Sequence, residues 1–394
     1  MSEDLYDRLV EGDHRALARA ITNIENRAPG YRDLVSKLYA HAGDAEVIGI
    51  TGSPGSGKST LVDKLAVHYR ERGETVGVIA VDPSSPFTGG AVLGDRVRMA
   101  SNVGDMDVFV RSMSARGTLG GLSTATSDAV KALDAFGKDV IIIETVGAGQ
   151  NEIDIVRTAD TVAVLVPPGS GDSVQTLKAG ILEIGDVFVV NKADKSGADR
   201  TVQELREMIQ LRPDTPGPRG LASPAGGDGH HGHGHGDGHG QGHGSGPGHR
   251  DGHGGGGGHG GGNGHGGEHG ESDVPWAEDE EEEETEAWVP RIVETVATKG
   301  EGVEELVETV DDHHAHLVES GQLEEKARTR TAEEIRTLLR QDTAGLLEGE
   351  VDRRGGMDDL VDAVLADETD PYTLADELIE PLAECLADRP DDGE

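Results

Sequence analysis

The stretch EVIGITGSPGSGKS, residues 46–59, is the strongest indication of the fold in this sequence. Its first part, Glu46–Thr51, is a short apolar run that predicts a buried β-strand. Its second part, Gly52–Ser59, fits the pattern G-x-x-x-x-G-K-S/T, and a helical run follows it. A strand, a glycine-rich loop and a helix in this order are the context in which this pattern binds phosphate. The sequence therefore predicts a P-loop fold with a phosphate site at the end of this strand.

Each part of the loop has a chemical task. The glycines let backbone N–H groups approach phosphate oxygens, and the start of the helix adds the positive end of its dipole. We expect the Lys58 ammonium to neutralise the β- and γ-phosphate oxygens and the Ser59 hydroxyl to ligate Mg²⁺. The predicted nucleotide-binding residues of this segment are Gly52, Gly55, Ser56, Gly57, Lys58, Ser59 and Thr60.

Beyond the loop, apolar strands alternate with helices, which predicts a three-layer α/β fold with a mainly parallel sheet covered on both faces. The expected strands after the loop are 75–81, 107–111, 139–144, 160–166, 186–190 and 291–296, and the expected helices are 122–136 and 198–211. Two helices are expected within residues 3–42, and three or four between Gly302 and Leu386. The resulting divisions are a helical extension (1–44), a P-loop domain (45–213, completed by 288–320), an insertion (214–287) and a C-terminal helical region (321–394).

A second motif, Asn191-Lys192-Ala193-Asp194, directly follows the expected strand 186–190. The Asp194 carboxylate can accept hydrogen bonds from N1 and N2 of guanine, whereas adenine offers neither donor there. Asn191 can bond the edge of the base, and the Lys192 stem can lie along the ring. The motif ends a strand at the sheet edge where ligands bind in such folds. It therefore predicts selection of a guanine nucleotide, because a site built for polar groups rejects a ligand that lacks them.

Three acidic residues between the two motifs are candidates for binding metal and supporting hydrolysis. Asp82 and Glu144 each end a strand, and Asp95 lies in a glycine-rich loop. Strand ends direct carboxylates at the phosphate site, where Mg²⁺ prefers oxygen ligands. Gly147 resembles a switch glycine that senses the γ-phosphate, and Gln150 is a candidate for positioning the attacking water. Each acid could instead cap a helix or lie in solvent.

Composition limits the partners of this chain. It has 75 Asp and Glu against 35 Lys and Arg, a formal net charge of -40. Such acidity suits a protein from a very salty cytosol, an ordinary acidic cytosolic protein being the alternative. The charge repels nucleic-acid phosphates and anionic membranes, so we expect neither as a partner. With one cysteine, no secretory signal and no apolar stretch of membrane-spanning length, we expect a soluble, cytoplasmic protein without disulfides.

The insertion 214–287 holds 27 of the 59 Gly and 11 of the 17 His, and it ends in a run of Glu. It contains too few apolar side chains to offset the entropy of ordering, so we predict disorder. His231, His233 and His235 alternate with Gly, so an extended chain could turn their imidazoles to one side and bind a divalent ion. A solvated linker is the alternative interpretation.

Several long stretches resemble the GTPases that act as chaperones for the adenosylcobalamin-dependent methylmalonyl-CoA mutase. That family was formerly labelled a lysine/arginine/ornithine transport kinase. The resemblance extends over nearly the whole chain outside 214–287. The matching stretches are ITGSPGSGKSTLVDKL, VIAVDPSSPFTGGAVLGDRVRM, RSMSARGTLGGL, DVIIIETVGAGQNE, PPGSGDSVQTLKAGI, VVNKAD and TDPYTLADELI.

The resemblance implies a GTPase with helical extensions, of which the C-terminal one serves homodimerisation. It implies that GTP hydrolysis gates adenosylcobalamin loading and protects the mutase. The loop 167–180 matches a mobile switch that reports the nucleotide state to the mutase. By motif match, the catalytic residues are Lys58, Asp95 and Glu144, the Mg²⁺ residues are Ser59, Asp82, Asp95 and Glu144, and the guanine residues are Asn191, Lys192 and Asp194.

Three features depart from the family pattern. The switch loop usually ends with two adjacent lysines, and here it reads Lys178-Ala179. The late guanine-contact loop is usually Ser-Ala, and here it reads Val296-Ala297, so only a backbone contact from Ala297 is expected. The insertion 214–287 is not a feature of the family.

Three other functions remain open. The histidine tract also suits a metallochaperone GTPase of the nickel-insertion type, although such proteins usually carry cysteine metal sites. A small-molecule or protein kinase linked to amino-acid transport could use the same P-loop, but the NKAD motif argues against ATP. A scaffold could bind GTP without hydrolysing it.

Overall fold

The computed structural model describes residues 2–82, 105–114, 124–145, 158–169, 183–210 and 287–387. The candidate residues Asp95, Gly147 and Gln150 lie outside the described residues, as does the insertion apart from Ala287. The backbone of Asp82 is described but its side chain is not. The predictions made for these parts of the chain therefore stay predictions.

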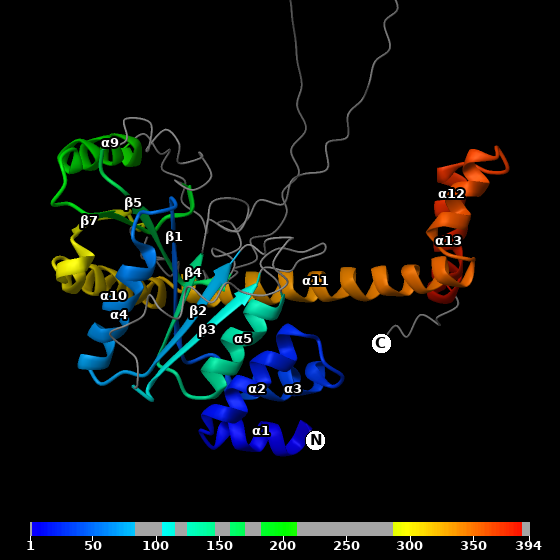
Figure 1. Ribbon diagram of the computed structural model, residues 1–394, viewed down its shortest axis with the longest axis horizontal. Coiled ribbons are helices and arrows are strands. Elements are labelled where there is room, and N and C mark those ends of the chain that lie inside the picture. Colours follow the sequence, from blue (N-terminus) through cyan, green and yellow to red (C-terminus); the bar gives the residue numbers. More distant parts are fainter. Residues whose placement is uncertain are drawn as a thin grey trace, which may run out of the picture. The chain divides into compact units, whose positions relative to one another are not determined.

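A seven-stranded sheet forms the centre of the described chain (Figure 1). Its strands lie in the order β3-β2-β4-β1-β5-β6-β7, and all neighbouring pairs are parallel. This confirms the predicted fold class and all seven expected strands, although β3 continues three residues beyond its expected end. The strands are β1 Glu46–Gly52, β2 Val76–Asp82, β3 Val108–Ser114, β4 Val140–Thr145, β5 Thr161–Val166, β6 Val187–Asn191 and β7 Arg291–Thr295.

Two hydrophobic cores cover the two faces of the sheet. Successive side chains of β4 alternate between them, since Ile141 and Ile143 belong to one core and Ile142 to the other. Every residue of β4, β5 and β6 is buried, as expected for strands covered on both sides. The first core is built with α1 Ser2–Val10, α2 His14–Glu25, α3 Tyr31–Leu38, α5 Thr124–Ala135 and α9 Ala198–Gln210, and the second with α4 Lys58–Glu71 and α10 Val303–Glu319.

The N-terminal extension has three α-helices and a short 3-10 turn, η1 Tyr39–His41, so the expectation of two helices was wrong. The helical conformation is interrupted after α1 at Gly12, whose φ is +89°. Asp13 then caps α2 by accepting hydrogen bonds from the backbone N–H groups of Arg15 and Ala16. The apolar spacing continues across this break, which is why the periodicity alone did not reveal it.

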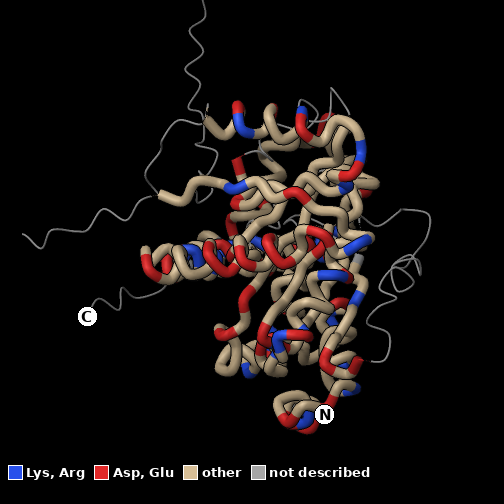
Figure 2. The backbone as a smooth tube through the Cα atoms, turned by 90° about the vertical axis from the view of Figure 1, so that its left-hand side faces the viewer, with Lys and Arg blue, Asp and Glu red and all other residues tan. Residues whose placement is uncertain are grey.

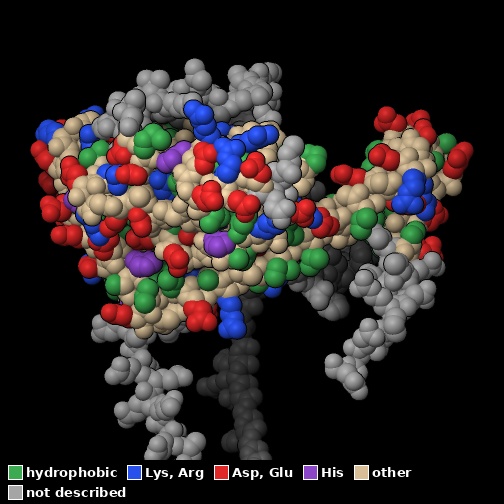
Figure 3. Space-filling model, turned by 90° about the horizontal axis from the view of Figure 1, so that it is seen from below, with side chains coloured by type: hydrophobic (Ala, Val, Ile, Leu, Met, Phe, Trp, Pro, Cys, Tyr) green, Lys and Arg blue, Asp and Glu red, His purple; other side chains and the backbone are tan. Residues whose placement is uncertain are grey.

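Four helices close the chain: α10, α11 Gln322–Arg353, α12 Met357–Leu365 and α13 Pro371–Ala387. This count agrees with the expected three or four. None of the residues of α11 or α12 is buried. The surface is acidic, with Asp and Glu spread along the backbone and over the face seen from below (Figures 2 and 3). Among the described helices, none combines the length and the apolar character needed to cross a membrane.

Candidate functional site

The P-loop joins the end of β1 to the start of α4 at the carboxyl edge of the sheet. Gly52, Gly55 and Gly57 all have positive φ values, of 135°, 77° and 101°. A Cβ on Gly52 would lie 2.2 Å from the backbone oxygen of Leu165, and one on Gly57 would lie 2.4 Å from Nδ2 of Asn191. Both positions therefore require glycine for conformation and for space.

Lys58 lies at the first position of α4 and is 6% exposed. Its Nζ donates hydrogen bonds to the backbone oxygens of Gly52 at 2.6 Å and Ser53 at 3.2 Å. The ammonium is thus folded back over the loop whose N–H groups are expected to cradle phosphates. This position fits the predicted neutralising role, because the charge lies in the loop that binds the anion.

The Ser56 hydroxyl is fully buried and has no hydrogen-bond partner among the described residues. Buried polar atoms are normally paired, so an orphaned hydroxyl calls for a missing partner. It belongs to the same loop as Lys58 and can donate to an anion. This observation fits a phosphate group bound at the loop.

Ser59 and Glu144 supply the oxygen atoms of a candidate metal site. The Ser59 hydroxyl donates to Oε1 of Glu144 at 2.6 Å, and Glu144 is 3% exposed. Glu144 lies on β4 opposite Ile50 of β1, and Asp82 ends the neighbouring strand β2 at the same edge of the sheet. Hydroxyl and carboxylate oxygens are the donors that Mg²⁺ prefers. Within the described part, no group of three or more His, Cys, Asp or Glu is placed to hold a metal ion.

The NKAD motif lies directly against the P-loop, although the two are far apart in the sequence. Nδ2 of Asn191 donates to the backbone oxygen of Ser56 at 2.8 Å, and Nζ of Lys192 donates to the backbone oxygen of Gly55 at 2.6 Å. Lys192 has a φ of +63°, which turns the chain sharply after β6. Asp194 is exposed two residues later. The structure thus brings both predicted motifs together at one edge of the sheet.

The loop after β7 completes this side of the site. The Ala297 backbone N–H donates to Oδ1 of Asn191 at 3.1 Å, so it lies beside the predicted guanine residues. The Thr295 hydroxyl donates to the same oxygen, also at 3.1 Å. Sequence reasoning missed Thr295, because a threonine at a strand end has no distinctive spacing. Its position next to Val296-Ala297 is the only signal that could have pointed to it.

Two titratable groups with strongly shifted pKa values lie outside the candidate site. Burial raises the pKa of Glu46, which begins β1 at the strand end opposite the P-loop, to about 8, and Asp311 adds to the shift. Burial lowers the pKa of His313 on α10 to about 4, against a smaller raising effect of Asp186. Neither group belongs to the P-loop or to the NKAD turn, so both affect the stability of the fold rather than the chemistry of the site.

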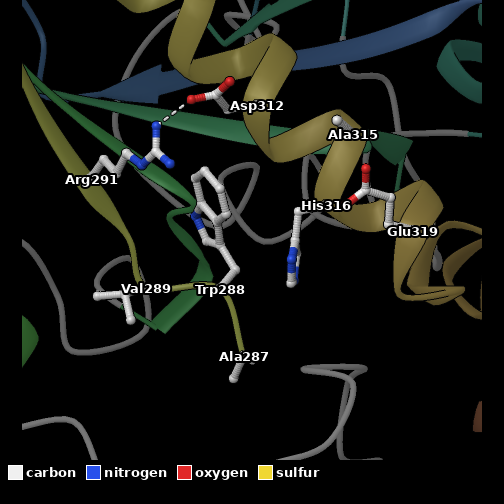
Figure 4. A pocket seen from close by; sticks show the side chains of 8 residues that line it. All are labelled: Ala287, Trp288, Val289, Arg291, Asp312, Ala315, His316 and Glu319. Atoms are coloured by element: carbon white, nitrogen blue, oxygen red, sulfur yellow. Dashed lines mark hydrogen bonds and ion pairs between the residues drawn. The ribbon is translucent and has the colours of Figure 1, made fainter. Parts of the chain in front are cut away.

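A surface pocket lies beside β7 and α10 (Figure 4). Trp288 stands in its centre, with the guanidinium of Arg291 at 4.7 Å from the ring centroid. Arg291 also pairs with Asp312 on α10. The pocket shares no residue with the P-loop or with the NKAD turn, so it is separate from the candidate nucleotide site. It is lined by Ala287, Trp288, Val289, Arg291, Asp312, Ala315, His316 and Glu319.

Comparison with known proteins gives a consistent picture. A family model described as "Methylmalonyl Co-A mutase-associated GTPase MeaB" matches residues 17–351. A protein of Pyrococcus abyssi, provisionally named a GTPase, is 41% identical over 382 residues and covers 97% of each chain. A similarly named protein of Pyrococcus horikoshii is 42% identical over 381 residues, covering 96% of this chain and 98% of the relative.

More distant relatives match about half of the chain. The mouse protein named "Methylmalonic aciduria type A homolog, mitochondrial" is 37% identical over 204 residues, covering 48% of this chain and 49% of its own. Among solved structures, one described as an LAO/AO transport system kinase covers 97% of both chains with a TM-score of 0.59 and 21% identity. That likeness supports the fold.

Proposed function

The chain belongs to the family of methylmalonyl Co-A mutase-associated GTPases and is itself a GTPase, and we propose that its nucleotide site consists of the P-loop, the Ser59–Glu144 pair and the NKAD turn. Lys58 binds the β- and γ-phosphates of GTP. The Asp194 carboxylate accepts hydrogen bonds from the N1–H and N2–H groups of guanine. Hydrolysis at this site yields GDP and phosphate.

The observation that carries this proposal is the direct contact between the two motifs. Asn191 and Lys192 donate to carbonyls of Ser56 and Gly55, so one nucleotide can reach the phosphate loop and the guanine turn together. Gly57 allows the Asn191 amide to lie this close to the P-loop, since a side chain at position 57 would collide with that amide. A P-loop kinase that uses ATP has no need for this arrangement.

The residues at the carboxyl edge fit a Mg²⁺ ion, which would polarise the phosphate oxygens when bound. The Ser59 hydroxyl donates a hydrogen bond to Glu144, so its lone pairs are available to a cation. We propose Ser59, Asp82, Asp95 and Glu144 as the residues that hold the ion, and Lys58, Asp95 and Glu144 as those that support hydrolysis. Glu144 is held by Ser59 on the buried edge of the sheet, which fixes the direction of its carboxylate.

The partner that we propose is an adenosylcobalamin-dependent methylmalonyl-CoA mutase. The GTPase gates the loading of its cofactor and protects the mutase. The description of the matching family supports this, together with the resemblance of the loop 167–180 to a nucleotide-reporting switch. We also propose a homodimer formed through the C-terminal helices. Large apolar side chains on these helices remain 46–83% exposed in the single chain, namely Ile335, Leu339, Leu346, Met357, Val361, Leu365, Tyr372 and Ile379.

Calorimetric titration of the full chain with GDP and with ADP, in Mg²⁺ and high salt, tests the nucleotide assignment. We expect GDP to bind at least a hundredfold more tightly, because adenine has no N–H donor at N1 or at position 2 for Asp194. Equal affinities would refute the guanine site. Lys58→Ala should abolish GTP hydrolysis, whereas Lys195→Ala, an exposed neighbour of the NKAD turn, should leave it unchanged. Capture of a mutase from native lysate, compared between GTP and GDP, tests the partner.

A further inference from the structure

Three buried polar atoms without partners come from elements that surround the start of β1, at the end of this strand opposite the P-loop. They are Oε1 of Glu46, the hydroxyl of Tyr69 and Nδ1 of His314, and none has a hydrogen-bond partner among the described residues. The Tyr69 side chain is fully enclosed, since the residue is 1% exposed. Buried polar atoms are normally paired, because a donor or acceptor that leaves water and gains no partner destabilises the fold. Three such atoms in one region therefore call for a shared partner.

The three side chains meet on one face of the sheet. Glu46 begins β1, and because side chains alternate along a strand, it faces the same core as Ile48 and Ile50, which contains α4 and α10. His314 lies on α10, and its Nδ1 is 4.0 Å from Oε1 of Glu46. Tyr69 lies in the last turn of α4 and belongs to the same core. Burial raises the pKa of its hydroxyl, and Glu46 adds more to this shift than any other charged group, as expected for close neighbours.

The gap between Glu46 and His314 suits one bridging molecule. At 4.0 Å the two atoms are too far apart for a direct hydrogen bond, which joins such atoms at about 2.7–3.2 Å. A water oxygen beside the line between them can lie at that distance from each. Water donates twice, so it can serve Oε1 and, in the tautomer that carries its proton on Nε2, also Nδ1. It can accept the Tyr69 hydroxyl in return. One water thus satisfies all three atoms, and three hydrogen bonds are typical of internal waters.

A metal ion suits these atoms less well. Burial raises the pKa of Glu46 to about 8, so at neutral pH the carboxyl is mostly protonated and offers no full charge to a cation. The charged groups that act on it are Asp311, Asp160 and Glu74, which raise its pKa further, and Arg72, which opposes them. Arg72 is itself paired with Asp311 at 2.7 Å and with Glu74 at 3.1 Å. In the described ranges, no three His, Cys, Asp or Glu side chains are grouped to bind a metal.

We propose that Glu46, Tyr69 and His314 form a buried hydration site, which holds one ordered water molecule between β1, α4 and α10. The site shares no residue with the P-loop or the NKAD turn, so it does not depend on the proposed nucleotide site. It closes the far end of the unit that carries the P-loop, since β1 runs from Glu46 into this loop and α4 runs from the loop to Tyr69. The water joins that unit to α10 through His314.

The isosteric change Tyr69→Phe gives the first test, by denaturant unfolding of the full chain at pH 7. If the hydroxyl is bonded to water, its removal should lower the equilibrium constant for folding about 5- to 30-fold. If the hydroxyl is unpaired, its removal should leave this constant unchanged or raise it, and that result overturns the proposal. Tyr372→Phe is the matched control, because Tyr372 is 83% exposed. Both variants are measured in protein dilute enough to dissociate the proposed dimer.

Two backgrounds show whether Tyr69 acts together with Glu46. Glu46→Gln keeps an acceptor oxygen and a neutral side chain, so the loss caused by Tyr69→Phe should persist in it. Glu46→Leu removes one of the three partners of the water, so the loss should become smaller there. Equal losses in the two backgrounds overturn the shared site.

A crystal structure of the full chain, at a resolution that shows ordered waters, gives the second test. We expect one density peak within hydrogen-bond distance of Glu46, Tyr69 and His314. A direct hydrogen bond between two of these side chains, or no peak among them, overturns the proposal. Crystals in which Rb⁺ replaces K⁺ separate water from a monovalent cation. An anomalous signal at the peak would make it a cation site and refute the proposed water, whereas its absence supports water.

Discussion

The two helical extensions of this chain bury very different surfaces. The N-terminal helices α1–α3 place Leu9, Leu17 and Ile21 in the core that covers one face of the sheet, each fully buried. The C-terminal helix α11 buries none of its residues. Its contacts with the rest of the fold include hydrogen bonds and ion pairs, such as those of Arg32 with Asp342 and of Arg330 with Asp160.

The difference shows that a helical extension can be part of the core or an attachment to it. Apolar burial stabilises by about 25 cal/mol per Å² and is insensitive to ionic screening, whereas exposed ion pairs contribute little and weaken in salt. The N-terminal helices should therefore unfold only with the sheet. The C-terminal helices keep apolar side chains available for a second copy of the chain, as proposed above.

Leu17→Ala should lower the free energy of unfolding by about 2–5 kcal/mol, because it leaves a cavity under α2. Chemical denaturation monitored by circular dichroism measures the loss. The comparison variant is Leu339→Ala on α11, measured in protein dilute enough to dissociate the proposed dimer. In the single chain this side chain is 61% exposed, so the same truncation should change the free energy of unfolding by less than about 0.5 kcal/mol. Similar losses at both positions would mean that the two extensions do not differ as described.

The contrast also marks what the sequence could predict. The strands were found because their apolar runs are short and bounded, and the P-loop and NKAD turn because chemistry fixes their spacing. The number of N-terminal helices was not found, because the break at Gly12-Asp13 preserves the apolar periodicity on both sides. The spacing of apolar residues along the sequence predicts which residues are buried, but it does not reveal a turn that leaves this spacing unchanged.

Parts of the candidate site were also beyond the sequence. Asn191 was expected to contact the base, but its ties to Ser56 and Thr295 depend on how β6 and β7 pair. Likewise, Glu144 was selected for its place at a strand end, whereas its hydrogen bond with Ser59 requires β4 and β1 to be neighbours. Sequence gives the residue types and the strand ends, and the order of strands in the sheet decides which of them meet.

The pH dependence of stability tests the junction between the core helix α10 and α11. Burial lowers the pKa of His313 from its ordinary value of 6.5 to about 4, and Lys326, His316 and His314 lower it further while Asp186 opposes them. The unfolded chain therefore binds this proton more readily than the folded chain. Stability from this group is complete above pH 6.5 and is lost progressively as the pH falls towards 4.

Between pH 6.5 and pH 4 the free energy of unfolding should fall by about 2–3 kcal/mol, as a pKa shift of this size implies. Denaturant unfolding at pH 7.5, 6.0 and 5.0 measures it, with His313→Gln expected to flatten the dependence. His68→Gln is a control, since this histidine lies on a different helix, α4. If stability depends on pH as steeply in His313→Gln as in the unchanged protein, other groups cause the acid sensitivity. Glu46 is not one of them: because its pKa is raised to about 8, its contribution to stability falls as the pH rises.

Arg330 holds the first half of α11 to the segment that directly precedes β5. Its guanidinium donates to Oδ1 of Asp160 at 2.6 Å and to the backbone oxygen of Thr158 at 2.9 Å, and Asp160 is 4% exposed. Arg330→Ala should cost about 1–3 kcal/mol, because it removes a charged donor from a buried carboxylate. Arg336→Ala is the control, since Arg336 forms an ion pair with Glu333 within α11. Hydrogen exchange along α11 should rise only in the first variant.

The smallest effect is expected where the two extensions touch directly. Arg32 on α3 makes two hydrogen bonds with Asp342 on α11, at 2.9 and 2.6 Å, and both side chains are about half exposed. Because water and salt screen such a pair, Arg32→Ala should lower stability by only about 0.2–1 kcal/mol at low salt, and by less in molar salt. Denaturation at the two salt concentrations measures this, with Arg200→Ala, which removes a pair within α9, as the control. A loss that persists in molar salt would show that α11 is held to α3 by more than charge, and the distinction between a core extension and an attached one would then weaken at this contact.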